Sequence, residues 1–295
     1  SLPELVSAII ASLKGESALV LGNVIGSNVA NITLIVGGAA VLRAMPIEKV
    51  MLERDGYLAL SAAVLLLLFA LNGVVSAFEG MVFFLLFVAY SVFLVQTSQD
   101  YQKAYHIRQF AQYFFRFGFI TGPADSLRKS VRRTKESKSD ESEVKESFDW
   151  RNFTTLLLSV FLIVLGGNFL VGEAVFFSNY FGLPVTLVGV ILALGTTAPE
   201  MSVSIAATRQ GMGGMVIGNA IGSVLCNTFL ILGVASLISP ISVSLLALKF
   251  AIPFLLGVTA ILLVFKRSNH EIRRIEGVGL CLLYLAFIGG YALLA

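Results

Sequence analysis

Charged residues are scarce in this chain. They make up 13% of its 295 residues, whereas an ordinary soluble domain carries about 25%. Cysteine and histidine are scarcer still, with two of each. Cys226 and Cys281 fall in apolar stretches, where no disulfide is expected, and His106 and His270 lack the spacing of metal ligands. No nucleophile elbow, Walker loop or dinucleotide fingerprint occurs either, and these absences together argue against an enzyme.

Apolar residues dominate instead. They form 57% of the chain and give a mean hydropathy of +0.87, which predicts a polytopic membrane protein. Eight stretches are long enough to cross a hydrocarbon core of roughly 30 Å as helices, and a shorter apolar piece, 2–13, precedes them. The expected spans are 17–42, 56–74, 78–98, 153–177, 184–208, 214–238, 243–265 and 275–294.

Basic residues predict the orientation of these spans. If the long segment 99–152 is cytoplasmic, alternation places the loops 43–55, 209–213 and 266–274 on the same side. Of the 21 basic residues, only Lys14 and Lys249 then fall elsewhere, as expected when Lys and Arg are retained in the cytoplasm. The net charge of +3 therefore follows from membrane topology, and no nucleic-acid partner is expected.

The segment 99–152 has two parts. Residues 107–117 mix aromatic and cationic side chains, which is typical of an interfacial helix. Residues 125–149 are rich in serine and in charges of both signs, which predicts a solvated tether with a disordered bias. Its basic part is expected to lie near anionic lipid.

A duplication is the most informative feature of the chain. Residues 1–31 and 197–227 align without a gap and share 12 of 31 positions. An odd number of spans, five, separates the two copies, so the second is inverted relative to the first. Inverted repeats place a shared site near the bilayer midplane. The shared residues are Pro3, Glu4, Ile9, Ala11, Gly15, Val20, Gly22, Asn23, Ile25, Gly26, Ser27 and Asn31.

Each copy opens with a carboxylate motif. The sequences Ser1-Leu2-Pro3-Glu4 and Thr197-Ala198-Pro199-Glu200 also fit a helix capping box. The second motif, however, lies in the middle of the apolar segment 184–208, so a helix has to break at membrane depth. A carboxylate there costs at least about 2.5–3.5 kcal/mol and typically marks an ion path, which favours a cation site over capping alone.

The second part of each copy adds neutral oxygen atoms. Residues spaced by four lie near one face of a helix, which predicts one polar row on each copy, beside a pair of glycines that suit close helix packing. Hydroxyl and amide oxygens beside a carboxylate are ligands that Ca²⁺ and Na⁺ prefer. The two rows are Asn23, Ser27 and Asn31, and Asn219, Ser223 and Asn227.

These motifs closely resemble the alpha repeats of sodium/calcium exchangers in the calcium/cation antiporter superfamily. The resemblance implies an all-α polytopic membrane protein with an inverted repeat of five-helix halves. Because the first repeat begins at Ser1, the first helix and half of the second are expected to be absent from this chain. The expected divisions are an N-terminal half, 1–98, a cytoplasmic linker, 99–152, and a C-terminal half, 153–295. By motif position the implied ligands of Na⁺ and Ca²⁺ are Ser1, Glu4, Ser27, Asn31, Thr196, Thr197, Glu200, Ser223 and Asn227.

The resemblance implies a secondary active antiporter that exchanges sodium for calcium by alternating access, without a cofactor, in a plasma or inner membrane. Some relatives carry Asp in place of Asn227, and that acid is associated with potassium co-transport, so this chain is expected not to need potassium. Two alternatives remain open. Glu4 and Glu200 could carry protons in a cation/proton antiporter, or the chain could be a non-transporting fragment that associates with another membrane subunit.

Overall fold

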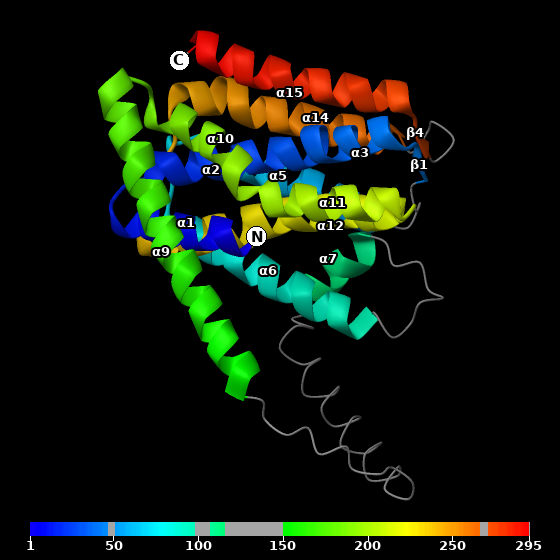
Figure 1. Ribbon diagram of the computed structural model, residues 1–295, viewed down its shortest axis with the longest axis horizontal. Helices are drawn as coiled ribbons and strands as arrows, with labels where there is room; N and C mark the ends of the chain where they lie inside the picture. Colours follow the sequence, from blue (N-terminus) through cyan, green and yellow to red (C-terminus); the bar gives the residue numbers. More distant parts are fainter. Residues whose placement is uncertain (47–50, 98–106, 116–149, 266–270, 295) are drawn as a thin grey trace, which may run out of the picture.

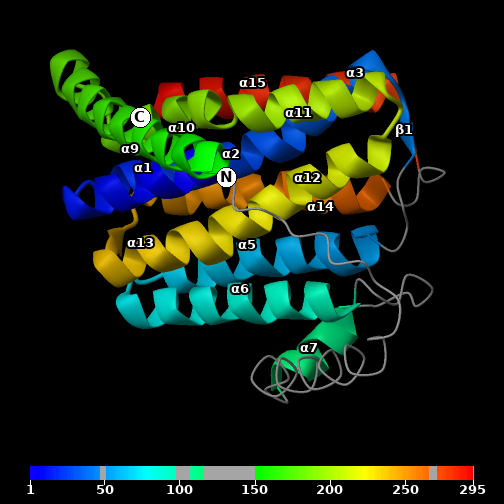
Figure 2. The ribbon, with the colours of Figure 1, turned by 60° about the horizontal axis from the view of Figure 1, so that its bottom comes forward.

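The computed structural model describes residues 1–46, 51–97, 107–115, 150–265 and 271–294. Most of its helices lie roughly parallel in one bundle, and the long helix α9 crosses the side of that bundle steeply (Figure 1). The N-terminus lies in the interior of the bundle, near α1, α11 and α12, in two views (Figures 1 and 2).

Before the linker, helices α1 and α2 are separated by a short turn, and two segments adopt a π-helical turn. The elements are α1 (Leu2–Leu13), α2 (Ser17–Ala30), the π-turn η1 (Asn31–Ile35), α3 (Val36–Leu42), β1 (Met45–Pro46), the π-turn η2 (Leu52–Gly56), α5 (Tyr57–Ala70), β2 (Val74–Val75), α6 (Ala77–Thr97) and α7 (Ile107–Phe115).

After the linker the same succession recurs, preceded by two further helices. The elements are α9 (Trp150–Phe181), α10 (Val185–Thr196), α11 (Ala198–Arg209), α12 (Gly213–Leu225), the π-turn η3 (Cys226–Ile231), α13 (Leu232–Ile238), β3 (Ile241–Ser242), the π-turn η4 (Ala247–Ala251), α14 (Ile252–Val264), β4 (Glu271–Ile272) and α15 (Arg274–Leu294).

The repeat is much longer than the motifs that reveal it. A shift of 196 residues places α1 on α11, and the continuous run α2–η1–α3 on α12–η3–α13. Within a residue or two, the same shift also places β1 on β3, η2 on η4, α5 on α14, β2 on β4 and α6 on α15. The fold is therefore an inverted repeat of helical halves, as expected from the sequence.

The four short strands join the halves crosswise. β1 pairs antiparallel with β4, aligning Met45 with Ile272, and β2 pairs antiparallel with β3, aligning Val75 with Ile241. Each half therefore contributes one strand to each pair. The pair β1–β4 lies at one end of the bundle (Figure 1), and these two-residue strands are the small departure from an all-α fold.

Six described helices are long and apolar enough to cross a membrane, or seven when the bent pair α10–α11 counts as one span. Six expected spans correspond to these helices, and the span expected at 184–208 is the bent pair. The span expected at 56–74 is α5 extended by η2. Its first turn carries the charged residues Glu53, Arg54 and Asp55, so its apolar part is only 14 residues long.

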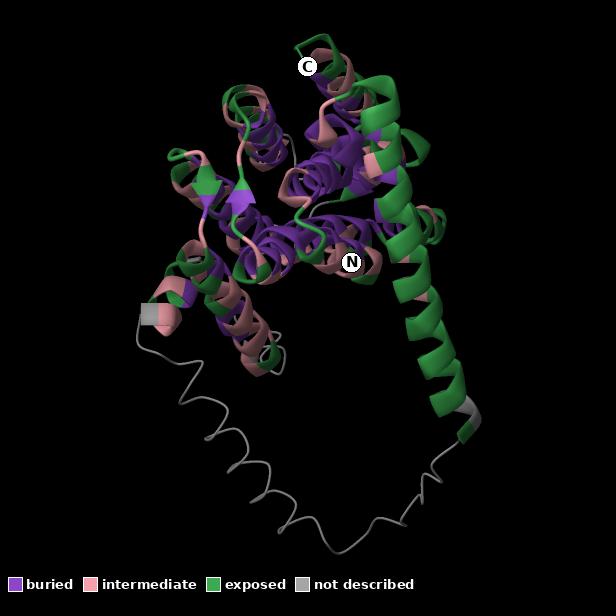
Figure 3. Ribbon diagram, turned by 90° about the vertical axis from the view of Figure 1, so that its left-hand side faces the viewer, coloured by how far each residue is buried: buried purple, intermediate pink, exposed green. Residues whose placement is uncertain are grey.

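Burial separates the interior helices from the periphery (Figure 3). The run α2–η1–α3 is almost wholly buried, whereas α9 is exposed along nearly its whole length. Exposed side chains of α9 include Leu156, Phe161 and Phe169, which suits contact with lipid acyl chains. The contacts of α9 with the bundle are mainly with α1 and α10.

Helix α7 and the first residues of α9 are the described parts of the segment 99–152. The rings of Phe110 and Phe93 meet edge to face at 5.5 Å, and the ring of Phe110 meets Tyr90 at 6.0 Å. Below them, the hydroxyl of Tyr90 donates to Oδ1 of buried Asp55 over 3.1 Å, and Arg54 holds both oxygens of that carboxylate. A helix is therefore present where one was expected, while the expected tether 125–149 and both histidines lie outside the described residues.

Candidate functional site

The site begins at a break in a helix. Thr197 separates α10 from α11, whose axes differ by 40°. Pro199 follows in the first turn of α11, as Pro3 does in the first turn of α1. The Thr197 hydroxyl donates back to the carbonyl oxygen of Ala193 over 2.8 Å. Neither Thr197 nor Ser1 makes the side-chain bond of a cap, so the capping interpretation of the two motifs is wrong.

The two carboxylates occupy equivalent places in α1 and α11. Glu4 is 1% exposed and Glu200 is 8% exposed, and their charges repel one another. Oε1 of Glu200 accepts a hydrogen bond from the hydroxyl of Ser1 over 3.3 Å and lies 3.0 Å from the Ser1 nitrogen. Oε2 of Glu200 and both carboxylate oxygens of Glu4 have no partner within the part of the chain that the structure describes.

Buried carboxylate oxygens without partners are unfavourable unless a cation neutralises them. The free lone pairs of Glu4 and Glu200 therefore fit a bound cation. Within the described ranges, no three His, Cys, Asp or Glu side chains come together. A cation bound here would thus take two carboxylates and neutral oxygen ligands, a set that suits Na⁺ and Ca²⁺ better than softer metals.

Neutral oxygen atoms come from the polar rows. Ser27 lies in α2 and Asn31 is the first residue of η1, while Ser223 lies in α12 and Asn227 is the second residue of η3. All four are buried. The hydroxyl of Ser27 and the amide groups of Asn31 and Asn227 have no hydrogen-bond partner among the described residues.

The packing of the helices brings these rows to the carboxylates. α1 packs against α2 and η3, and α11 packs against α12 and η1. Each carboxylate-bearing helix therefore touches the row of its own repeat and the π-turn of the other repeat. π-turns are rare and occur often at functional sites, and here they begin at or next to Asn31 and Asn227.

Thr196 links the two repeats directly. Its buried hydroxyl lies 3.3 Å from Oδ1 of Asn23 and 3.3 Å from the carbonyl oxygen of Ala193. Asn219, the counterpart of Asn23, donates to the hydroxyl of Ser204 over 3.2 Å. Asn23 and Asn219, which begin the two polar rows, are thus engaged in holding neighbouring helices.

Sequence reasoning missed three features of this region. It did not find the π-turns, because no residue pattern marks them, and it did not find Ser204. It also missed Asn28 and Thr228, whose side chains meet over 2.9 Å. Asn28 is a polar residue inside an apolar span and could have been noticed, but its partner lies 200 residues away.

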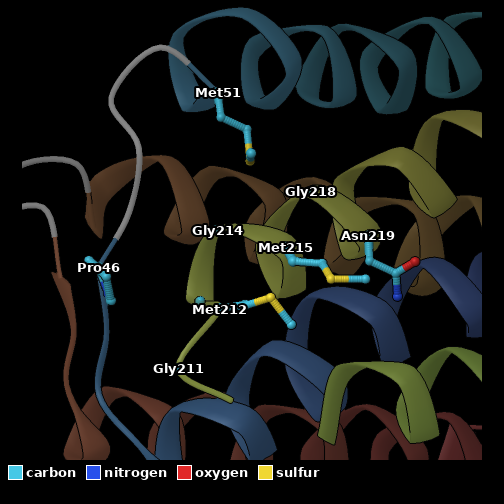
Figure 4. Close-up of a pocket in the computed structure, with 9 residues that line it drawn as sticks. Pro46, Met51, Gly211, Met212, Gly214, Met215, Gly218 and Asn219 are labelled. Carbon is cyan, nitrogen blue, oxygen red and sulfur yellow. The ribbon is translucent and has the colours of Figure 1, made fainter. Parts of the chain in front are cut away.

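A cavity of about 580 Å³ lies beside the second repeat (Figure 4). Asn219 and the glycine face of α12 form one wall, and Met51 and Pro46 of the other half form the opposite wall. The corresponding face of α2 is filled by α10, because a Cβ added at Gly22 would meet the backbone of Thr186. A Cβ added at its counterpart Gly218 would meet no backbone and would contact only the flexible side chain of Met51, 3.3 Å from its Cε atom.

Named relatives align with nearly the whole length of this chain. A family profile described as sodium/calcium exchanger protein matches residues 1–96 and 151–291. Sodium/calcium exchanger MaX1 of Methanosarcina acetivorans is 42% identical over 294 residues, which are 98% of this chain and 84% of that protein. Inner membrane protein YrbG of Escherichia coli is 27% identical over 285 residues, covering 96% and 79% of the two chains.

Solved structures share the fold. The sodium-calcium exchanger NCX_Mj, soaked with 100 mM Na⁺ and 10 mM Sr²⁺, superposes with a TM-score of 0.61 at 22% identity, covering 98% of this chain and 82% of that one. The same protein soaked with 2.5 mM Na⁺ and 0.1 mM Ca²⁺ gives a TM-score of 0.61 at 23% identity, with 97% and 81% coverage. The chain shares its fold with these structures, and by its family profile and its relative MaX1 this multi-pass membrane chain is a cation exchanger and belongs to the sodium/calcium exchanger family.

Proposed function

We propose that this chain exchanges Na⁺ for Ca²⁺ by alternating access at a site between its two repeats, near the bilayer midplane. The observation that carries the proposal is the pair of buried carboxylates, Glu4 and Glu200, of whose four oxygens three have no partner among the described residues. The proposed ligands are the nine residues that match the repeat motifs: Ser1, Glu4, Ser27, Asn31, Thr196, Thr197, Glu200, Ser223 and Asn227.

Charge balance supports exchange over simple leakage. Two carboxylates supply two negative charges, which one Ca²⁺ neutralises and which Na⁺ neutralises only by multiple occupancy. An empty, doubly charged site is disfavoured inside the membrane, so the protein crosses between its two access states only when loaded. Each change of access state then carries either Na⁺ or Ca²⁺ across the membrane, in opposite directions.

The neutral ligands support the choice of ions. Hydroxyl, amide and carboxylate oxygens are hard donors, and Ca²⁺ takes six to eight of them at about 2.3–2.6 Å. The π-turns η1 and η3 carry Asn31 and Asn227, whose amide oxygens have no partner among the described residues. MaX1, at 42% identity, carries the name sodium/calcium exchanger.

The proposal also covers the setting of the site. We place the chain in a plasma or inner membrane, and the relative named inner membrane protein YrbG supports this choice. The halves 1–98 and 153–295 act as the two repeats, and 99–152 acts as a cytoplasmic connection.

The test is Ca²⁺ uptake into vesicles that contain the purified chain. An outward Na⁺ gradient should drive uptake, and collapsing that gradient with a sodium ionophore should stop it. A pH gradient imposed without sodium is the second arm. Uptake driven by the pH gradient alone would replace sodium coupling by proton coupling, and no uptake under either gradient would contradict exchange by this chain.

A further inference from the structure

Asn28 and Thr228 join two of the ligand-bearing segments of the protein, α2 and η3. The amide nitrogen of Asn28 donates to the hydroxyl of Thr228 over 2.9 Å. Asn28 is 0% exposed and follows Ser27 in α2, and Thr228 is 1% exposed and follows Asn227 in η3. The bond therefore connects the chain neighbours of one proposed ligand from each repeat.

The duplication does not account for this bond. The shift of 196 residues places Val224 at the position of Asn28 and Ile32 at the position of Thr228. Both counterparts are buried and apolar, so the second repeat keeps no equivalent contact. A polar pair in a dry interior is unfavourable unless its members bond to each other, and this pair is present once, beside the site.

A single contact orients the Asn28 amide. Oδ1 of Asn28 is buried and has no hydrogen-bond partner in the described ranges, so the bond to Thr228 is the contact that holds the side chain. Thr228 itself lies within a π-turn, where the regular spacing of helical hydrogen bonds is interrupted. An external bond at this residue fixes the turn that also carries Asn227.

We propose that Asn28 and Thr228 are a positioning pair, which sets the spacing between Ser27 in the first repeat and Asn227 in the second and so tunes calcium affinity against sodium affinity. The inference rests on the proposed function, since it concerns ions bound at the same site. Selectivity among hard cations depends on cavity size, ligand number and rigidity. A bond that fixes the distance between α2 and η3 affects both the size and the rigidity of the proposed ion site.

The test compares two buried threonines. Thr228→Val keeps the shape of the side chain and removes the hydroxyl that Asn28 contacts. Thr33→Val is the matched control, because Thr33 is equally buried and lies in η1, but its hydroxyl donates within its own helix to the carbonyl oxygen of Val29. Both variants are reconstituted, and Na⁺-driven Ca²⁺ uptake is measured over a range of external Ca²⁺ and of competing Na⁺.

Thr228→Val should raise the Ca²⁺ concentration for half-maximal uptake about tenfold, because the buried Asn28 amide loses the hydrogen-bond partner that it has among the described residues. Its maximal rate should stay close to that of Thr33→Val, whereas its melting temperature should be lower, because the buried Asn28 amide is left without a partner. Thr228→Ser, which restores a hydroxyl, should recover the affinity. In a double-mutant cycle, Asn28→Leu combined with Thr228→Val should be no worse than either single change, because contacting residues are not additive.

Two outcomes would overturn the proposal. One is a shift in half-maximal Ca²⁺ no larger than that of Thr33→Val, and the other is a loss of stability with unchanged ion competition. Failure of the proposed function is distinguishable, because the unmodified chain would then show no Na⁺-driven uptake. In that case the rise in melting temperature caused by added Ca²⁺ alone, which reports binding, still compares the two variants and decides the role of the pair.

Discussion

Gly26 of α2 lies so close to Val190 of α10 that a Cβ added to the glycine would stand 2.9 Å from the Cα of Val190. The same Cβ would stand 2.9 Å from the Cβ of Ala193. Backbone atoms cannot move aside as a flexible side chain can, so this crossing requires glycine. Its repeat counterpart, Gly222 on α12, has open space in the same direction.

Gly26→Ala should therefore destabilise the protein, by about 1–3 kcal/mol as for other overpacked sites. Gly222→Ala is the matched control in the same motif of the other repeat, and it should be neutral or slightly stabilising because alanine favours helix over glycine. Thermal unfolding in detergent measures both. Equal losses for the two variants would mean that the packing asymmetry between α2 and α12 is wrong.

Glu200→Gln should lower Na⁺-driven Ca²⁺ uptake by at least about a hundredfold, which corresponds to roughly 3 kcal/mol. The change removes one charge from the site at nearly constant shape. Glu173→Gln is the control, because Glu173 lies exposed on α9, and it should leave uptake unchanged. Melting curves of both proteins show whether folding is intact. Substantial uptake by Glu200→Gln would remove the carboxylate from the ion site.

Exchange should proceed without potassium. Asn227 is neutral, so the site holds two acids and lacks a third that would balance an additional monovalent cation. Uptake is measured in media with and without K⁺, and Asn227→Asp is expected to raise cation affinity or to create a potassium requirement. Activity of the unmodified chain that vanishes in potassium-free medium would contradict this interpretation of Asn227.

Tyr90→Phe should lower the stability of the corner where α7 meets α6, by about 0.5–1.5 kcal/mol, the usual net value of one hydrogen bond. The ring and its contact with Phe110 remain, while Asp55 loses one of its donors. Tyr180→Phe is the control, because that side chain is 72% exposed. Unfolding monitored in detergent should separate the two, and identical curves would show that the Tyr90 hydroxyl contributes nothing.

Much of the fold could be predicted because the duplication leaves strong marks. Pro3 and Pro199 mark the starts of equivalent helices, and apolar length marks the spans. The break at Thr197 followed from a polar motif inside an apolar run. The exception was α5, where charged Glu53 to Asp55 shorten the apolar stretch and a π-turn continues the helix.

The candidate site was predictable in its residues and less so in its geometry. Glu4, Asn31 and their counterparts are repeated, so the sequence itself identifies them. The bond from Asn28 to Thr228 occurs in one copy only, and a contact across 200 residues has no local signal. The π-turns could not be predicted for a similar reason, since their hydrogen-bond pattern depends on packing rather than on particular residues.

The crosswise strands restrict which movements the proposed alternating access can use. Because β1 pairs with β4 and β2 with β3, the backbone of each half is tied to the other at two separate places. Rocking one complete half against the other, as two rigid blocks, would have to break those backbone hydrogen bonds in every transport cycle. Displacement of peripheral helices against a fixed interior avoids that loss, and α9, with its long exposed surface (Figure 3), contacts the bundle mainly through α1 and α10.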